Sequence, residues 1–362
     1  MSYGAAANRA LAKRRIARIL AAVSVCALLA SGLGASDTFG APSGQQPTLD
    51  QGTLGGAAYR IDVPANWNGT LLLYSHGYVI PGSDNPAVDA PDPATRIALV
   101  ATGYALAGSA YRSTGWAVAE AMDDQLALLD YFVGQYGEPQ RTIAWGTSMG
   151  GLITAGLIER APARFAAAMP TCGVMAGGIG SWNAALDGAF VLKTLLAPSA
   201  SLDLVRVGNP QANVDTARAA VERARATPAG RARLALVVAL FDVPGWYDPQ
   251  NSEPAADDYA TQLQAQTSWL TLWDLLFGFG LRAELEERAG GNPSWNTDVD
   301  YRAQLARSRN AAEVRALYAA GGLDLDADLG TLNAAPHITA DPAAAAFLAS
   351  NLTLSGTITV PV

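Results

Sequence analysis

Between residues 55 and 171 the sequence alternates short apolar segments with longer segments in which apolar residues recur at helical spacing. This pattern predicts strands at 55–63, 70–75, 104–109, 142–145 and 165–171, and helices at 92–101, 117–135 and 149–160. The turn-rich segment 64–69 predicts that the first two strands form a hairpin. Strands that alternate with helices indicate the α/β class, with a doubly wound, mostly parallel sheet and right-handed crossovers.

After Cys172 the pattern changes, because helical spacing dominates and strand patterns almost disappear. Helices are predicted at 182–196, 215–227, 231–241, 259–276, 310–320 and 341–348. Asn310 and Glu313 have the spacing of a capping box at the start of one of them. We therefore expect residues 42–174 to form the N-terminal part of an α/β core, and residues 175–355 to form a large helical cap inserted into it.

The N-terminus has the composition of a secretory signal peptide. The first 18 residues contain five basic side chains and no acid, and an apolar run follows from Ile19 to Ala30. A membrane-spanning helix is the alternative, but the run is short and is followed by Gly32 and Gly34 rather than by basic residues. We expect residues 1–41 to be removed, which leaves a secreted or periplasmic protein with no stable membrane span.

The charge balance argues against nucleic acid as a partner. The chain has 24 basic and 32 acidic side chains, and the expected cleavage removes five bases and one acid, which leaves 19 against 31 and a net charge of about −12. An acidic surface repels phosphate backbones, so we expect no nucleic-acid partner. After cleavage Cys172 is the one remaining cysteine, so no disulfide is expected within the mature chain.

Metal binding is not expected either. The chain has two histidines and two cysteines, and these residues do not have the spacing of zinc ligands. The acidic run from Asp324 to Asp328 resembles the start of a calcium loop, but Gly330 comes one position late and Ala335 replaces the required glutamate. We interpret the run as a solvated turn, and we expect no metal and no other cofactor.

The segment Gly146-Thr-Ser148-Met149-Gly150 lies between a predicted buried strand and a predicted helix. A G-x-S-x-G pentapeptide in that position is typical of a nucleophile elbow, a sharp strand-to-helix turn that presents the serine hydroxyl. The two glycines remove the Cβ atoms that would clash across such a turn. Ser148 is therefore the candidate nucleophile, and the backbone N–H of Met149 is a candidate donor to an oxyanion.

A second oxyanion donor is expected from the loop after an earlier strand. The predicted strand 70–75 is followed by His76-Gly77-Tyr78. We assign the backbone N–H of Tyr78 to the oxyanion hole, with Gly77 allowing the backbone to approach the substrate carbonyl. The side chain of His76 is interpreted as a brace of this loop and not as the catalytic base.

The order and spacing of these pieces resemble the α/β-hydrolase superfamily, in particular secreted bacterial esterase- or lipase-like members with a large helical lid. The resemblance covers residues 55–174 and implies a serine hydrolase whose triad follows the order serine, acid, histidine. The segment 103–116 is also similar to such enzymes. Within it, Tyr111 and Trp116 either line the site or pack in the core.

The acid and the base have two possible assignments. In the first, residues 356–362 begin the strand that carries the acid, so that the acid, the histidine and the last strands of the sheet lie beyond Val362. In the second, His337 is the base and one aspartate of the run 324–328 is the acid, because His337 precedes a predicted helix, as the catalytic histidine of the family commonly does. We favour the first, since no strand pattern precedes His337 or the aspartates.

The predicted function is hydrolysis of small-molecule carboxylic esters through an acyl-enzyme at Ser148. Under the first assignment this chain would be impaired, because a serine hydroxyl without an imidazole base is a weak nucleophile. A peptidase of the same fold is one alternative, and a noncatalytic ligand-binding protein that kept the fold is another. The sequence contains nothing that sets the oligomeric state.

Overall fold

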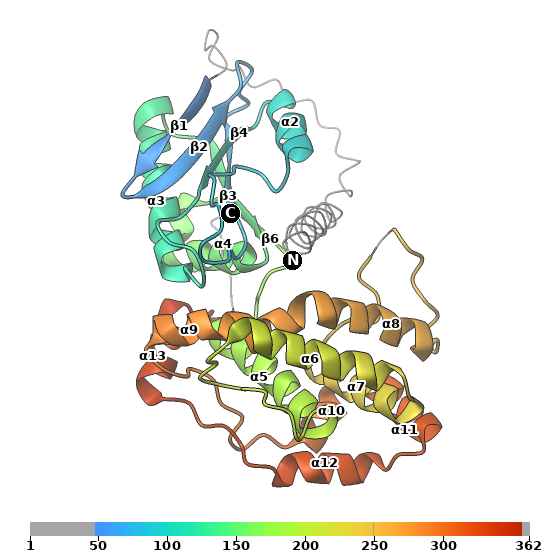
Figure 1. Cartoon of the computed structure of the whole chain (residues 1–362). Coiled ribbons are helices and arrows are strands. Elements are labelled where there is room, and N and C mark those ends of the chain that lie inside the picture. Colours follow the sequence, from blue (N-terminus) through green and yellow to red (C-terminus); the bar gives the residue numbers. More distant parts are fainter. Residues whose placement is uncertain (1–47, 249, 357–362) are drawn as a thin grey trace, which may run out of the picture. The chain divides into compact units, whose positions relative to one another are not determined.

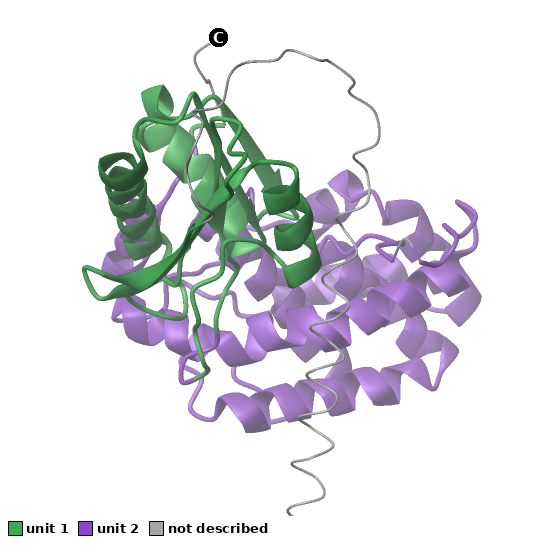
Figure 2. Ribbon diagram, turned by 90° about the horizontal axis from the view of Figure 1, so that it is seen from above, with its two compact units in different colours: residues 1–79, 83–173, 355–362 green, residues 80–82, 174–354 purple. Residues whose placement is uncertain are grey.

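The computed structural model describes residues 48–248 and 250–356. The chain divides into two compact units, which are coloured separately in Figure 2. Of the described residues, the first unit comprises 48–79, 83–173 and 355–356, and we call it the core unit. The second comprises 80–82 and 174–354, and we call it the helical unit. The expected signal peptide, residues 1–41, lies outside the described residues.

The core unit is built on a six-stranded mixed sheet with the strand order β1-β2-β4-β3-β5-β6 (Figure 1). The strands are β1 (Thr48–Leu54), β2 (Ala57–Val63), β3 (Thr70–Ser75), β4 (Ala105–Ser109), β5 (Arg141–Thr147) and β6 (Ala167–Thr171). The strands β4, β3, β5 and β6 are parallel, whereas β1 and β2 are antiparallel to each other and β2 is antiparallel to β4. The expected α/β class is confirmed.

The hairpin expected between 55–63 and 70–75 is wrong. β2 pairs with β4, and β3 lies on the far side of β4. The hairpin is instead formed by β1 and β2, whose connection contains Gly55 and Gly56 with positive φ. Strand β1 escaped detection because its side chains are all exposed or half-buried, and it shows no apolar alternation.

Helices pack on both faces of the sheet. α2 (Pro93–Ala101), α3 (Val118–Tyr136) and α4 (Met149–Arg160) follow β3, β4 and β5, and Figure 1 shows α2 and α3 on opposite sides of the sheet. Along β3, Leu72 and Tyr74 join a cluster that includes Leu99 of α2, while Leu71 and Leu73 point to the other face and are fully buried. Burial on both faces explains why β3 is a nearly continuous apolar run.

The helical unit contains, among its described residues, nine α-helices and two π-helical turns. They are α5 (Gly177–Leu196), α6 (Pro210–Arg225), α7 (Pro228–Leu240), α8 (Tyr259–Trp269), η3 (Leu270–Asp274, π-helical), η4 (Phe277–Leu281, π-helical), α9 (Arg282–Ala289), α10 (Tyr301–Arg307), α11 (Ala311–Gly321), α12 (Leu325–Ala334) and α13 (Pro342–Asn351). Every residue of α7 from Leu234 to Leu240 is buried, and α7 belongs to one apolar cluster with residues of α5, α6 and α11.

Three of these helices, α9, α10 and α12, are not indicated by the sequence pattern. α12 begins in the acidic run that was interpreted as a solvated turn, and that interpretation is wrong. Asp324 is the N-cap of α12, with its side chain accepting from the Ala327 N–H at 3.1 Å. Asp328 is buried and accepts two hydrogen bonds from Arg233 of α7. The acids therefore start a helix and attach it to α7, because carboxylates near a helix N-terminus satisfy its unpaired N–H groups.

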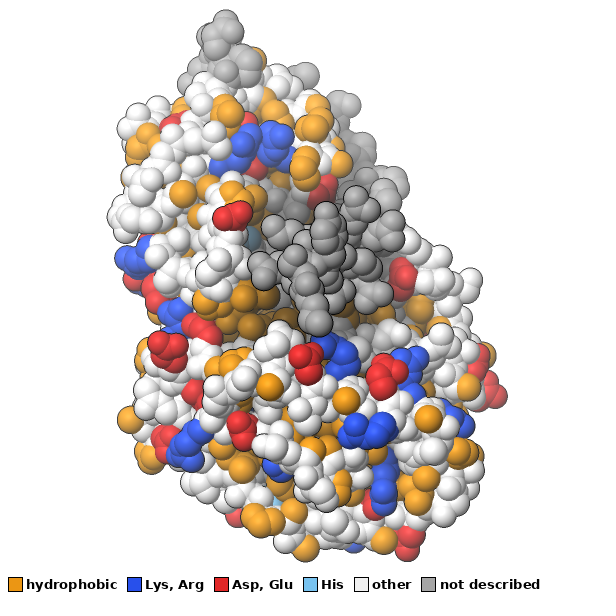
Figure 3. Space-filling view, in the orientation of Figure 1, with side chains coloured by type: hydrophobic (Ala, Val, Ile, Leu, Met, Phe, Trp, Pro, Cys, Tyr) orange, Lys and Arg blue, Asp and Glu red, His pale blue; other side chains and the backbone are white. Residues whose placement is uncertain are grey.

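The described surface mixes both signs of charge. Figure 3 shows acidic and basic side chains interspersed on the visible face of the helical unit. Exposed ion pairs join some of them, such as Arg218 with Asp215 and Arg225 with Glu222 on α6. Within residues 48–248 and 250–356, no helix has the length and apolar character needed to cross a membrane.

Candidate active site

Ser148 lies in a sharp turn between β5 and α4. β5 ends at Thr147 and α4 begins at Met149, so Ser148 is the single residue between them. Its backbone has a φ of 61° and a ψ of −123°, a conformation that non-glycine residues rarely adopt. The Ser148 N–H donates to the Thr171 carbonyl at 3.1 Å, and the Ser148 carbonyl accepts from the Gly151 N–H at 2.9 Å. These bonds help to hold the turn in its strained conformation.

Close backbone packing requires glycine on either side of Ser148. A Cβ atom on Gly146 would lie 2.6 Å from the carbonyl oxygen of Ser75. One on Gly150 would lie 2.7 Å from the carbonyl oxygen of His76 and would overlap that of Ser75. Cβ atoms essentially never come this close to other atoms, so the turn after β5 packs directly on the end of β3.

The ends of β3 and β5 meet where the strand order reverses. The chain passes from β3 to β4 on one side and then crosses back to β5 on the other side of β3. In α/β sheets, ligands bind beyond the carboxyl ends of strands at such a switch point. A Cβ atom on Gly77, in the loop after β3, would lie 3.4 Å from Cβ and 3.8 Å from Oγ of Ser148. The loop 76–78 therefore contacts the nucleophile turn.

Two backbone N–H groups near Ser148 are candidates to bind an oxyanion. Met149 is the first residue of α4, where the first N–H groups of the helix have no partner within the helix and the helix dipole favours negative charge. Tyr78 follows Gly77 in the loop that contacts Ser148. The assignment of these two N–H groups to the oxyanion hole remains a prediction.

The imidazole of His76 is buried beneath this loop, with 8% of the residue exposed. Its Nδ1 lies 2.7 Å from the carbonyl oxygen of Gly77, and its ring stacks on Tyr111 with the centroids 4.0 Å apart. Burial lowers the pKa of His76 below its usual value, so the ring is neutral at physiological pH. These contacts support the interpretation of His76 as a brace.

Two further residues position the loop after β3, a role that the sequence analysis did not predict. Tyr111 has a φ of 59°, and its hydroxyl donates to the His76 carbonyl at 3.1 Å. Gln125 of α3 donates through Nε2 to the Tyr74 carbonyl at 2.5 Å and to the hydroxyl of the next residue at 3.0 Å. Tyr111, Gln125 and Trp116 are all buried, so the two aromatic residues pack in the core. No local pattern could identify these contacts, because they join residues far apart in the chain.

Known proteins resemble this chain in sequence. Residues 102–177, which include the nucleophile turn, match the prolyl oligopeptidase family. An o-phthalyl amidase from Xanthobacter agilis is 29% identical over 315 residues, which cover 79% of this chain and 67% of that protein. The chain is an α/β-hydrolase.

Solved structures similar to this α/β-hydrolase include two esterases. One from Pyrococcus furiosus is 15% identical, with a TM-score of 0.31 over 40% of this chain and 55% of its own. A carboxyl esterase from Bacillus coagulans is 16% identical, with a TM-score of 0.29 over 44% of this chain and 54% of its own. The chain thus spans about half the length of these structures.

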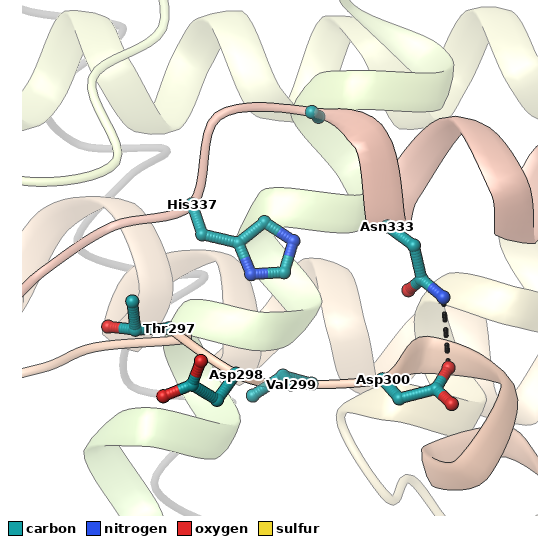
Figure 4. Close-up of a pocket in the computed structure, with 7 residues that line it drawn as sticks. Thr297, Asp298, Val299, Asp300, Asn333 and His337 are labelled. Atoms are coloured by element: carbon teal, nitrogen blue, oxygen red, sulfur yellow. Dashed lines mark hydrogen bonds between the residues drawn. The ribbon is translucent and has the colours of Figure 1, made fainter.

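The second histidine of this α/β-hydrolase, His337, lies in the helical unit. It borders a shallow surface pocket of about 460 Å³ that is shown in Figure 4 and is lined by Thr297, Asp298, Val299, Asp300, Asn333, Ala335 and His337. Its Nδ1 lies 2.6 Å from the Asn296 carbonyl oxygen, and its Nε2 lies 3.3 Å from that of Leu332. Because a carbonyl oxygen only accepts hydrogen bonds, the ring nitrogen that carries a proton donates to the backbone, and the other nitrogen also faces a carbonyl. This arrangement favours a structural role over that of a base.

The aspartates proposed as partners of His337 make other contacts. Asp324 caps α12, and Asp326 lies 3.7 Å from Nε of Arg302. Asp328 forms an ion pair with Arg233, with an N–O distance of 2.8 Å. Each carboxylate thus has a local role in attaching α12 to its surroundings.

The described part of the chain offers no evident metal site, since no three histidine, cysteine, aspartate or glutamate side chains within it are placed to share an ion.

At the end of the helical unit the chain returns to the core unit, where the N–H and Oγ of Ser355 donate to Glu159 of α4 at 2.9 and 2.8 Å. The expected strand at 356–362 lies, apart from residue 356, outside the described residues.

Proposed function

We propose that this protein is a serine hydrolase that cleaves carboxylic esters through an acyl-enzyme at Ser148. The position of Ser148 carries the proposal: it is the single residue between β5 and α4, it has a φ of 61°, and Gly77 packs against its side chain. A backbone conformation of this kind costs about 1–3 kcal/mol, and such strain is typical of functional sites. A nucleophile elbow accounts for the strained backbone conformation of Ser148.

In the proposed reaction, Oγ of Ser148 attacks the acyl carbon, its proton passes to a base, and the carbonyl oxygen becomes an oxyanion. The N–H groups of Tyr78 and Met149 stabilise that oxyanion, and loss of one such donor lowers kcat by a factor of about 10²–10³. The base then gives the proton to the leaving alcohol, and water releases the acid from Ser148.

We also propose that neither histidine of the chain is this base. His76 is buried and stacks on Tyr111, and both ring nitrogens of His337 face backbone carbonyls. The family order of serine, acid and histidine puts the base after the acid in the chain, and the experiment below tests whether residues beyond 362 supply it. Without a base, the oxyanion hole and substrate binding alone give a residual acceleration of about 10³–10⁴ over water.

This part of the proposal is tested by comparing the rates of ester hydrolysis of two proteins. One comprises residues 42–362, and the other is extended by the coding sequence after Val362. We expect the extended protein to hydrolyse a p-nitrophenyl ester much faster, and His337→Gln in that protein to leave kcat unchanged. Hydrolysis by residues 42–362 at ordinary enzyme rates, abolished by His337→Gln, would show instead that His337 is the base.

An amide is the second candidate substrate, because the relative that is 29% identical is named an o-phthalyl amidase. p-Nitrophenyl benzoate and benzoyl p-nitroanilide carry the same acyl group and differ in the bond that is cleaved. We expect a higher kcat/KM for the ester. A higher kcat/KM for the anilide would assign the protein to amide hydrolysis through the same nucleophile.

A fluorophosphonate probe, which reacts with activated serine nucleophiles, tests the role of Ser148 directly. In the extended protein we expect one labelled site, lost in Ser148→Ala and kept in Ser268→Ala, which changes an exposed serine of α8. Absence of labelling in the folded extended protein would support a noncatalytic, ligand-binding protein. Labelling that survives Ser148→Ala would exclude Ser148 as the nucleophile.

A further inference from the structure

A second unusual site lies in the helical unit, where the helical geometry changes between α8 and α9. The two π-helical turns η3 and η4 follow α8, and Arg282 is the first residue after η4. π-Helical turns make up well under 1% of residues in globular proteins and occur frequently at functional sites. Arg282 therefore occupies a position that is typical of binding residues.

The guanidinium of Arg282 is fully buried, with no exposed surface. Its Nη2 donates to the Trp182 carbonyl at 3.1 Å, whereas Nε and Nη1 have no hydrogen-bond partner in the described structure. Burial lowers the pKa of Arg282 to about 10, so the group still carries its charge at neutral pH. A buried charge without partners is costly, and proteins normally pair such groups.

The acid one turn along the helix does not satisfy Arg282. Glu286 attracts the guanidinium electrostatically, but its two carboxylate oxygens accept from the backbone N–H groups of Arg206 and Val207, at 2.9 and 3.3 Å. The Nε and Nη1 groups of Arg282 thus have no partner in the described part of the chain, and an anion that binds them must enter a space that is closed to solvent in this conformation.

Aromatic rings lie beside this cation. The guanidinium carbon of Arg282 is 5.7 Å from the ring centroid of Trp182, a distance typical of a cation–π contact. The ring of Phe277, in η4, is 5.9 Å from that of Trp182 at an interplanar angle of 59°. A ligand that reaches Arg282 would therefore meet aromatic surface as well as positive charge.

We propose that Arg282 binds the carboxylate of an aromatic acid within the helical unit. Arginine is suited to this role because its planar guanidinium presents several N–H donors to the oxygens of a carboxylate. The neighbouring rings favour an aromatic carboxylate over a free inorganic anion. This site goes beyond the proposed reaction and does not depend on the nucleophile, so Ser148→Ala retains it.

Binding of benzoate to the full chain carrying Ser148→Ala, measured by calorimetry, tests the proposal. Benzamide has the same ring without the charge, and inorganic phosphate has charge without the ring. We expect benzoate to bind at least tenfold more tightly than either, and Arg282→Lys to weaken benzoate binding at least tenfold. Arg218→Met, which removes an exposed arginine of α6, is the control and should bind benzoate like the parent.

Thermal unfolding separates this role from a purely structural one. Because Arg282→Met replaces an unsatisfied buried charge with an apolar side chain, we expect its Tm without ligand to equal or exceed that of the parent, and benzoate to leave that Tm unchanged. Equal affinity of the parent for benzoate and benzamide, or full benzoate affinity in Arg282→Lys, would overturn the proposal. So would a Tm in Arg282→Met that falls and yet still rises with benzoate.

Discussion

Gly150 lies in the first turn of α4, at a position where other residue types would favour the helix more than glycine does. The structure supplies the reason for glycine, since the carbonyls of Ser75 and His76 occupy the space that a Cβ atom would need. Gly134 in α3 differs from Gly150 in its surroundings. It is exposed, and a Cβ atom there would meet nothing within 4 Å. Glycine is thus required in one helix and replaceable in the other.

The two positions predict opposite effects of the same substitution. Gly150→Ala forces the nucleophile turn away from β3, and we expect the free energy of unfolding to fall by about 1–3 kcal/mol, with slower fluorophosphonate labelling of Ser148. Gly134→Ala should raise the free energy of unfolding by about 1 kcal/mol, through helix propensity alone. Urea denaturation measures both, and a Gly150→Ala protein as stable as the parent would contradict the packing described.

Among the helices, α11 shows how a surface motif in the sequence becomes an interior contact. Asn310 is the N-cap of α11, where the capping-box spacing predicted the helix to start, but its side chain makes no cap hydrogen bond, so the predicted box does not form. Its Nδ2 donates instead to the Val243 carbonyl at 2.8 Å, and Glu313 accepts from Nε2 of Gln266 on α8 at 3.0 Å. Glu313 is 2% exposed, so its side chain faces α8 and not solvent.

The burial of Glu313 predicts a pH dependence of stability. Burial raises its pKa from 4.5 to about 7, so between these values the folded state holds a proton that the unfolded state has lost. The contribution of Glu313 to stability therefore falls as the pH rises from about 4.5 to about 7. We expect Glu313→Gln to be more favourable at pH 8 than at pH 4, by on the order of 2 kcal/mol after allowance for solvent screening.

Chemical denaturation at the two pH values measures this difference. The matched control is Glu222→Gln on α6, where the carboxylate is exposed and pairs with Arg225. Its effect on the free energy of unfolding should be small and nearly equal at both pH values. If Glu313→Gln shows the same small difference, Glu313 is ionised in the folded state at neutral pH and its burial has little effect.

At the scale of the whole molecule, each of the two units has an interior of its own. The helical unit encloses a large apolar cluster that includes α7 and residues of α5, α6, α11 and α12. The core unit buries both faces of the parallel strands β3 and β4. A hydrophobic interior of this kind is the main source of stability of a folded domain.

Residues 174–354, expressed alone, should therefore fold. We expect a helical circular dichroism spectrum and a single cooperative thermal transition, because the cluster around α7 is completed within this segment. Leu236→Asp places a charge at a position with no exposed surface and should abolish the transition. A gradual loss of helical signal in the unsubstituted segment would show that its helices need the rest of the chain.

Sequence periodicity predicted most of the regular elements of the core unit, because burial on one or both faces leaves a local apolar pattern. Periodicity failed to predict elements in which the apolar pattern is weak. β1 has no buried face, and three tyrosine hydroxyls, those of Tyr59, Tyr131 and Tyr136, hold it through the carboxylate of Asp50. α9, α10 and α12 are short helices in which few residues are buried.

The sequence by itself determined the α/β class, the change to a helical segment after residue 172, and Ser148 with its flanking glycines, because these depend on periodicity and on steric rules within a few residues. The tertiary structure decided which strands are neighbours, which carbonyls exclude a Cβ atom at Gly150, and which partners His76 and His337 have. It also decided that Arg282 is buried with Nε and Nη1 unpaired. The reason is physical: pairing, burial and desolvation are set by residues distant in sequence, and no local pattern records them.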